Sequence, residues 1–90
     1  MTAISSPTNR TLADLSAGQA GLVTELHNEG PDRRRMMDLG IVPGTLITVE
    51  MKSPLGDPVA YRVRGALVAL RYEQARLISI TDAPIVEENQ

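Results

Sequence analysis

The apolar residues of this chain fall into short runs that end at glycine or proline turns. In two runs, 47–51 and 59–63, the larger apolar side chains occupy every second residue, as they do in half-buried β-strands. Further short runs lie around Leu22, at 66–70 and at 78–80, so we expect about five strands. Because a small flat sheet would leave its edges unpaired, the sequence predicts a mainly β fold, a compact and partly open barrel.

Two stretches predict short helices within this β-rich chain. Pro31 and Asp32 are typical of a first helical turn and Gly40 of the residue that ends a helix, which places a two-turn helix at about 33–39. Residues 72–75 resemble a single helical turn. Met36 and Met37 are adjacent and cannot both face the core, so we expect one of them to be exposed.

The connections between strands follow from proline and glycine. Residues 53–58 join the two alternating strands and are expected to form a hairpin loop. Residues 42–45 have proline and glycine at the two central positions that a type II turn favours. The imperfect alternation of residues 22–26 predicts a β-bulge near Gly21.

A chain of 90 residues suits a single small domain. We expect this domain at 12–82, between a disordered N-terminal tail at 1–11 and a C-terminal tail at 83–90. The longest uninterrupted apolar run has five residues, whereas a membrane helix needs about 20. We therefore expect a cytoplasmic chain that does not insert into a membrane.

The residue types present argue against catalysis, and we expect no enzyme, no cofactor and no metal site. The chain has no cysteine, a single histidine, His27, and a single lysine, Lys52. Glu25, Glu29 and Asp32 lie near His27 in sequence, but together they offer only a weak adventitious site. The net charge of −2 and the lack of Phe and Trp also disfavour nucleic acid as a partner.

The strongest local charge is the arginine run at 33–35. These guanidinium groups could pair with carboxylates or phosphates of a partner, or they could form a solvated helix face, which is the commoner role of short basic runs. An exposed methionine beside them would add an adaptable apolar contact. Both interpretations stay open from the residues alone.

The motifs "LGIVPG" at 39–44 and "PLGDP" at 54–58, followed by "LVALR" at 67–71, closely resemble the FeoA family in order and spacing. The resemblance covers about 12–81. It implies an SH3-like β-barrel, which in this family is either free-standing or joined to the end of metal-dependent repressors; we expect the free-standing form. Free-standing members act with the membrane ferrous-iron transporter FeoB, whose cytosolic part is a GTPase domain, and regulate it rather than carry iron.

The resemblance therefore implies a protein partner, and the residues suggest where it binds. We expect the interface at Arg33, Arg34 and Met37 on the helix, and at the hairpin tip of Leu55, Gly56 and Asp57. An apolar side chain at such a tip has no core to enter. The alternative is a small barrel that acts in transcription or binds nucleic acid, like the C-terminal domain of metal-dependent repressors.

Overall fold

One curved, antiparallel sheet dominates the computed structural model, which describes residues 10–83. Its strands are β1 (Ala20–Leu26), β2 (Leu46–Lys52), β3 (Val59–Val63), β4 (Ala66–Leu70) and β5 (Ile78–Asp82), in the order β4-β3-β2-β1-β5. The helical elements are η1 (Leu12–Asp14), α1 (Gly30–Asp38) and α2 (Tyr72–Ala75). The five strands and two short α-helices confirm the sequence prediction, and the 3-10 helix η1 is an addition to it. Most of the two expected tails lies outside the described residues.

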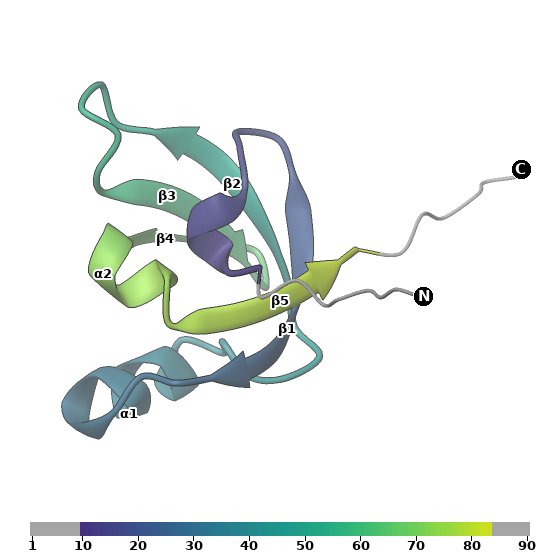
Figure 1. Cartoon of the computed structure of the whole chain (residues 1–90), viewed down its shortest axis with the longest axis vertical. Coiled ribbons are helices and arrows are strands. Elements are labelled where there is room, and N and C mark those ends of the chain that lie inside the picture. The colour runs from purple at the N-terminus through teal and green to yellow at the C-terminus, as the bar shows by residue number, and fades with distance from the viewer. Residues whose placement is uncertain (1–9, 84–90) are drawn as a thin grey trace, which may run out of the picture.

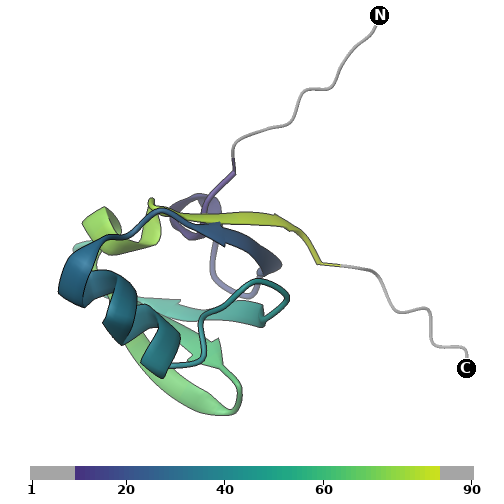
Figure 2. The same ribbon diagram turned by 90° about the horizontal axis from the view of Figure 1, so that it is seen from below.

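The sheet bends around the core, so that β2 and β3 lie across from β5 (Figure 1). β4 and β5 are the two ends of the sheet, and α2 connects them in sequence. Seen from below, α1 stands to one side of the strands, and the end of β5 points to the other (Figure 2). Within residues 10–83, no helix has both the length and the apolar character needed to cross a membrane.

The core is filled by the inward side chains of every strand, and the alternation in sequence matches burial. In β3, Val59, Tyr61 and Val63 are buried, whereas Arg62 between them is exposed. Tyr61 is 1% exposed, and its hydroxyl donates to the carbonyl oxygen of Leu12 at 3.4 Å, which links the sheet to η1. Burial, with the nearby negative charge of Asp57, raises the pKa of Tyr61 to about 12.

β1 contains an irregularity of the kind that the imperfect alternation of residues 22–26 predicts, but it lies at 23–25 rather than at Gly21. Gly21 pairs in regular register, and the shift in β1 lies between Val23 and Glu25. Gly21 instead meets a packing requirement, because a Cβ atom at this position would lie 2.6 Å from Cδ1 of Ile80. A second register shift, which the sequence did not predict, bends β2 against β3.

The outer edge of one end strand is covered by other residues, and the outer edge of the other is not. Thr11 forms a β-bridge with Ser79, and the Ile80 amide donates to the carbonyl of Arg10 at 3.0 Å, so residues 10 and 11 cover the edge of β5. Arg10 also forms an ion pair with Asp82. Beside β4, no further strand lies within the described part of the chain. The barrel is therefore open along β4.

Candidate partner-binding surfaces

Helix α1 carries the first expected surface, and its ends are set by the local sequence. Pro31 lies in the first turn, where a missing amide hydrogen costs nothing. At the other end Gly40 has φ 90°, its amide donates to the Met37 carbonyl at 2.9 Å, and the Ile41 amide donates to the Met36 carbonyl at 2.9 Å. These two bonds form a Schellman motif, which confirms Gly40 as the residue that stops the helix.

The side chains of α1 divide between the core and solvent. Met36 is fully buried while Met37 is 50% exposed, which confirms that only one of the pair can face inward. Arg33 donates from Nη1 to the carbonyl of Leu26 at 2.8 Å and thereby ties α1 to the end of β1. Arg34 is exposed. All three expected contact residues on α1 are therefore exposed, and Arg33 also ties the helix to the end of β1.

The second expected surface is the loop between β2 and β3, which is the predicted hairpin. The Gly56 amide donates to the Ser53 carbonyl at 2.8 Å, and Gly56 has φ 85°, so the loop contains a tight turn. Leu55 at the tip is 93% exposed. The Asp57 carboxylate accepts the amide hydrogen of Tyr72 at 2.7 Å, across to α2. Leu55 and Asp57 are both exposed, and Asp57 also holds the loop against α2.

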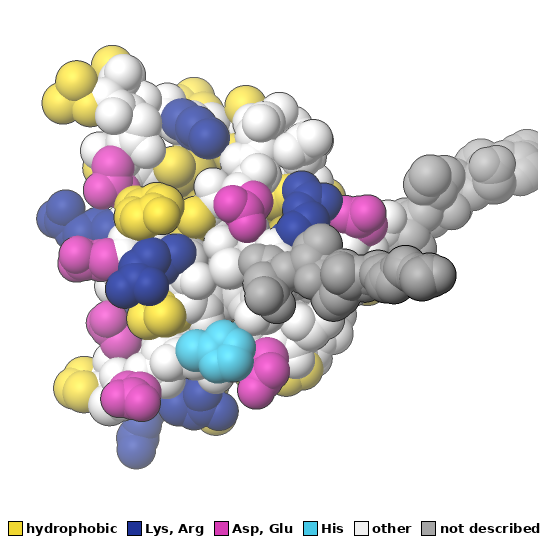
Figure 3. Space-filling view, in the orientation of Figure 1, with side chains coloured by type: hydrophobic (Ala, Val, Ile, Leu, Met, Phe, Trp, Pro, Cys, Tyr) yellow, Lys and Arg dark blue, Asp and Glu magenta, His cyan; other side chains and the backbone are white. Residues whose placement is uncertain are grey.

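The structure does not bring these two surfaces together. The β2–β3 loop stands at the top of the molecule and α1 at the bottom (Figure 1). Over the face seen in the same orientation, acidic and basic side chains are interspersed and hydrophobic ones form separate small groups (Figure 3). A partner that used both surfaces would have to reach along the molecule's long axis.

His27 lies on the exposed side of the β1–α1 connection. Its Nε2 atom is 3.2 Å from Oγ of Ser79 and 3.7 Å from Oε1 of Glu25. Across residues 10–83, no group of three or more His, Asp or Glu side chains is placed to hold a metal ion.

Sequence reasoning missed Arg64, whose backbone is unusual. Arg64 and Gly65 form the two-residue connection between β3 and β4, with φ values of 51° and 86°. Both central residues of a type I′ turn have positive φ, which Asn and Gly adopt readily, whereas other L-residues pay about 1–2 kcal/mol. The sequence did contain a signal for this turn, because Arg64 and Gly65 are the two residues between the apolar runs 59–63 and 66–70.

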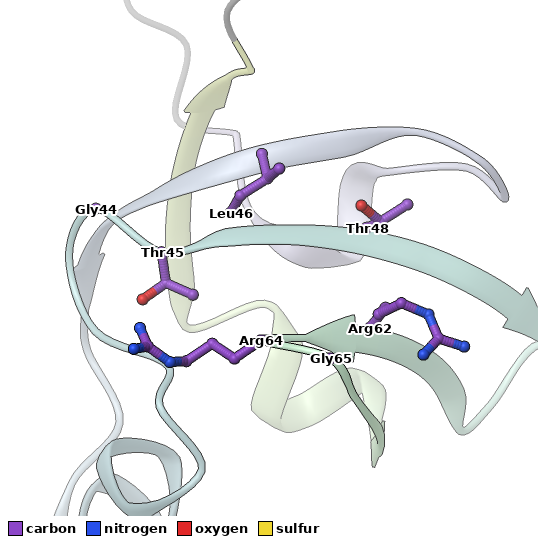
Figure 4. Close-up of a pocket in the computed structure, with 7 residues that line it drawn as sticks. All are labelled: Gly44, Thr45, Leu46, Thr48, Arg62, Arg64 and Gly65. Carbon is purple, nitrogen blue, oxygen red and sulfur yellow. The ribbon is translucent and has the colours of Figure 1, made fainter.

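A shallow groove of about 410 Å³ runs between this connection and the turn at 42–45 (Figure 4). That turn is closed by a bond from the Thr45 amide to the Val42 carbonyl at 3.0 Å, with Gly44 at φ 95°, as the type II prediction requires. Leu46 and Thr48 of β2 and Arg62 of β3 line the groove between the two turns.

Comparison with known proteins assigns the chain to a protein family. The model of the FeoA domain matches residues 10–82, which is most of the chain. This chain belongs to the FeoA family. The family is linked to ferrous-iron transport, as the resemblance of the two sequence motifs implied.

Three relatives show how much of each chain the similarity covers. A fusion protein of Fe(2+) transport protein A and the Fe(2+) transporter FeoB, from Porphyromonas gingivalis W83, is 36% identical over 69 residues. Those residues make up 77% of this chain and 8% of the fusion protein. The solution structure of FeoA from Chlorobium tepidum has a TM-score of 0.79 at 36% identity, covering 83% of this chain and 71% of that one.

The crystal structure of Stenotrophomonas maltophilia FeoA, solved with zinc, has a TM-score of 0.72 at 25% identity. The match covers 80% of this chain and 89% of that one, and that protein is described as a prokaryotic SH3 domain protein. This similarity and the five-stranded sheet of this FeoA chain confirm the expected SH3-like barrel.

Proposed function

We propose that this FeoA chain regulates ferrous-iron uptake by binding the cytosolic region of the transporter FeoB. The observation that carries the proposal is the Porphyromonas gingivalis relative, in which a FeoA part and FeoB form one polypeptide. Covalent linkage keeps the two parts close together at a high effective concentration. Where FeoA and FeoB are separate proteins, they need affinity for each other to stay together. The proposed role is therefore cytoplasmic, non-catalytic binding.

We place the contact on the two exposed surfaces, at Arg34 and Met37 of α1 and at Leu55 of the hairpin tip. Leu55 supplies an exposed apolar side chain that a partner can cover, and Arg34 supplies a charge that can steer an acidic partner. Arg33, Gly56 and Asp57 contribute by holding these elements in place.

A pull-down with the cytosolic GTPase region of FeoB, repeated with the whole transporter in detergent, tests this function. Arg34→Glu is expected to weaken binding and reduce its salt dependence, because it reverses a steering charge. Leu55→Asp is expected to weaken binding at all salt concentrations, because it buries a charge at an apolar contact. Arg76→Glu, an equal charge reversal at the exposed end of α2, serves as the matched control.

Melting curves accompany each variant, since Arg34 and Leu55 lie outside the core and their replacement should leave stability unchanged. If both folded variants bind as the wild type does, the interface is elsewhere. If the wild type itself fails to bind, FeoB is not the partner.

The alternative role in nucleic-acid binding rests on the arginine run at 33–35. One guanidinium nitrogen of Arg33 is engaged by the Leu26 carbonyl, and the net charge of −2 opposes contact with phosphates. Retention on a nucleic-acid column that falls steeply with salt would support this alternative against FeoB binding.

A further inference from the structure

We propose that the groove around Arg64 is a separate docking site, which binds an extended segment of a partner protein through an acidic side chain flanked by apolar ones. The groove lies on the outer face of β2 and β3 and includes none of the residues of α1 or of the β2–β3 loop. The proposal therefore stands independently of the contact with FeoB.

The backbone of Arg64 is the first argument. With φ 51°, it occupies a conformation in which Asn or Gly would be more stable. Backbone strain of this kind is retained where the side chain has a task that the surrounding structure supports. The task must belong to the arginine side chain, since the turn itself would form better with another residue.

The packing of Arg64 is the second argument, because it orients the side chain in advance. Gly40 leaves room for it: a Cβ atom on Gly40 would lie 2.6 Å from Cδ of Arg64. The loop at Gly40 is in turn held by Thr45, whose Oγ1 donates to the Gly40 carbonyl at 2.9 Å. The Arg64 side chain extends along the groove toward Thr45 (Figure 4). The Arg64 side chain is exposed, but the packing of its stem against Gly40 reduces the conformational entropy that it loses when it binds.

The third argument is charge. Arg62, the other arginine of the groove, donates from Nε to Oε1 of Glu50 at 2.9 Å. For Arg64, no acidic side chain lies within ion-pair distance anywhere in residues 10–83. A planar guanidinium without a counter-charge fits a carboxylate through two parallel hydrogen bonds.

The surroundings of Arg64 indicate what carries that carboxylate. Leu46 in the groove is 50% exposed, and Leu67, which pairs with Arg62 from β4, is 57% exposed. The groove is shallow, whereas sites for small molecules enclose most of their ligand. A polypeptide segment with an acidic residue between apolar ones can pair with Arg64 and cover both leucines.

The probe for the test is the blocked peptide acetyl-Leu-Glu-Leu-amide, titrated into isotope-labelled protein and followed by NMR. We expect shifts of the amides at 44–46 and 62–65, with a Kd of roughly millimolar for so short a peptide. The same peptide with Gln in place of Glu should bind about fivefold more weakly, since it lacks the charge. Shifts that are absent, that lie elsewhere or that are equal for the two peptides would overturn the proposal.

Variants of Arg64 separate its binding role from its role in the turn. Arg64→Asn creates the residue pair that type I′ turns favour, so the unfolding midpoint should not fall, while peptide affinity should drop about tenfold. Arg64→Lys keeps the charge without the planar fork, and a smaller loss is expected. Arg76→Asn, at an exposed arginine outside the groove, should bind as the wild type does. A folded Arg64→Asn protein with wild-type affinity would disprove the site.

Discussion

The carboxylate of Asp57, in the loop between β2 and β3, accepts the amide hydrogen of Tyr72 at the start of α2, at 2.7 Å. Fifteen residues separate them in sequence. The first amides of a helix have no partner inside it, and an acceptor from elsewhere in the chain can satisfy them. Asp57 thus joins the loop that presents Leu55 to the helix that links β4 to β5.

Removing this acceptor should destabilise the domain. Asp57→Ala is expected to lower the free energy of unfolding by about 1 kcal/mol, as loss of a capping group does. Asp57→Asn keeps an oxygen acceptor and should lose less. Urea denaturation of the two variants measures the difference, and equal losses would show that the hydrogen bond is not what stabilises the loop.

Gly21 should not tolerate a methyl group, because of Ile80. In Gly21→Ala the new Cβ atom would lie 2.6 Å from Cδ1 of Ile80, and overpacking of this kind costs about 1–3 kcal/mol. Ile80→Val removes that methyl group and alone costs about 0.5–1.5 kcal/mol. The double variant should be more stable than the sum of the two losses predicts. Additive losses in a thermal or urea double-mutant cycle would place the strain elsewhere.

Met36 and Met37 form a matched pair on α1. Met36→Ala should lower the free energy of unfolding by about 2–5 kcal/mol, because it opens a cavity at a fully buried position. Met37→Ala, at a position that is 50% exposed, should change it by less than about 0.5 kcal/mol. The comparison is made by denaturant unfolding, and similar losses for both would contradict the orientation of α1.

Tyr61 should make the domain sensitive to alkali. Its pKa rises from 10.0 to about 12 on folding, so the neutral phenol is favoured in the native state. The associated stability is complete below pH 10 and is lost as the pH rises toward 12. Between about pH 9 and about pH 11 the loss should be about 1.4 kcal/mol.

Tyr61→Phe is the control for this alkaline loss, because it removes the ionising group and keeps the ring. The variant should lack the loss, although other groups that titrate in the same range will act on both proteins. Parallel alkaline curves for the variant and the wild type would rule out Tyr61 as the cause.

Local sequence was enough to predict the features that local chemistry determines. The stop at Gly40 and the alternation of β3 depend on neighbours in the chain, and both were predicted. The bonds of Arg33 to Leu26 and of Asp57 to Tyr72 depend on how separate elements pack, which no pattern of residues shows. The sequence therefore suggested two partner surfaces but could not show which of their exposed side chains also bond to other elements of the fold.

Gly21 and Arg64 show the same limit in two further ways. A β-bulge was predicted near the glycine, whereas the role of Gly21 is to make room for Ile80 on a neighbouring strand. The turn at Arg64 and Gly65 could have been predicted from the sequence and was overlooked, whereas the contact of Arg64 with Gly40 needs coordinates.

The ion pair between Arg10 and Asp82 brings the first and last described segments of the domain side by side. The end of β5 points away from α1 and from the hairpin tip (Figure 1). A domain whose ends meet in this way can be inserted into, or attached to, a longer polypeptide at one point without bending its sheet. This barrel could therefore be joined to another polypeptide at its paired ends. Helix α1 and the hairpin tip, which lie away from these ends, would then stay exposed.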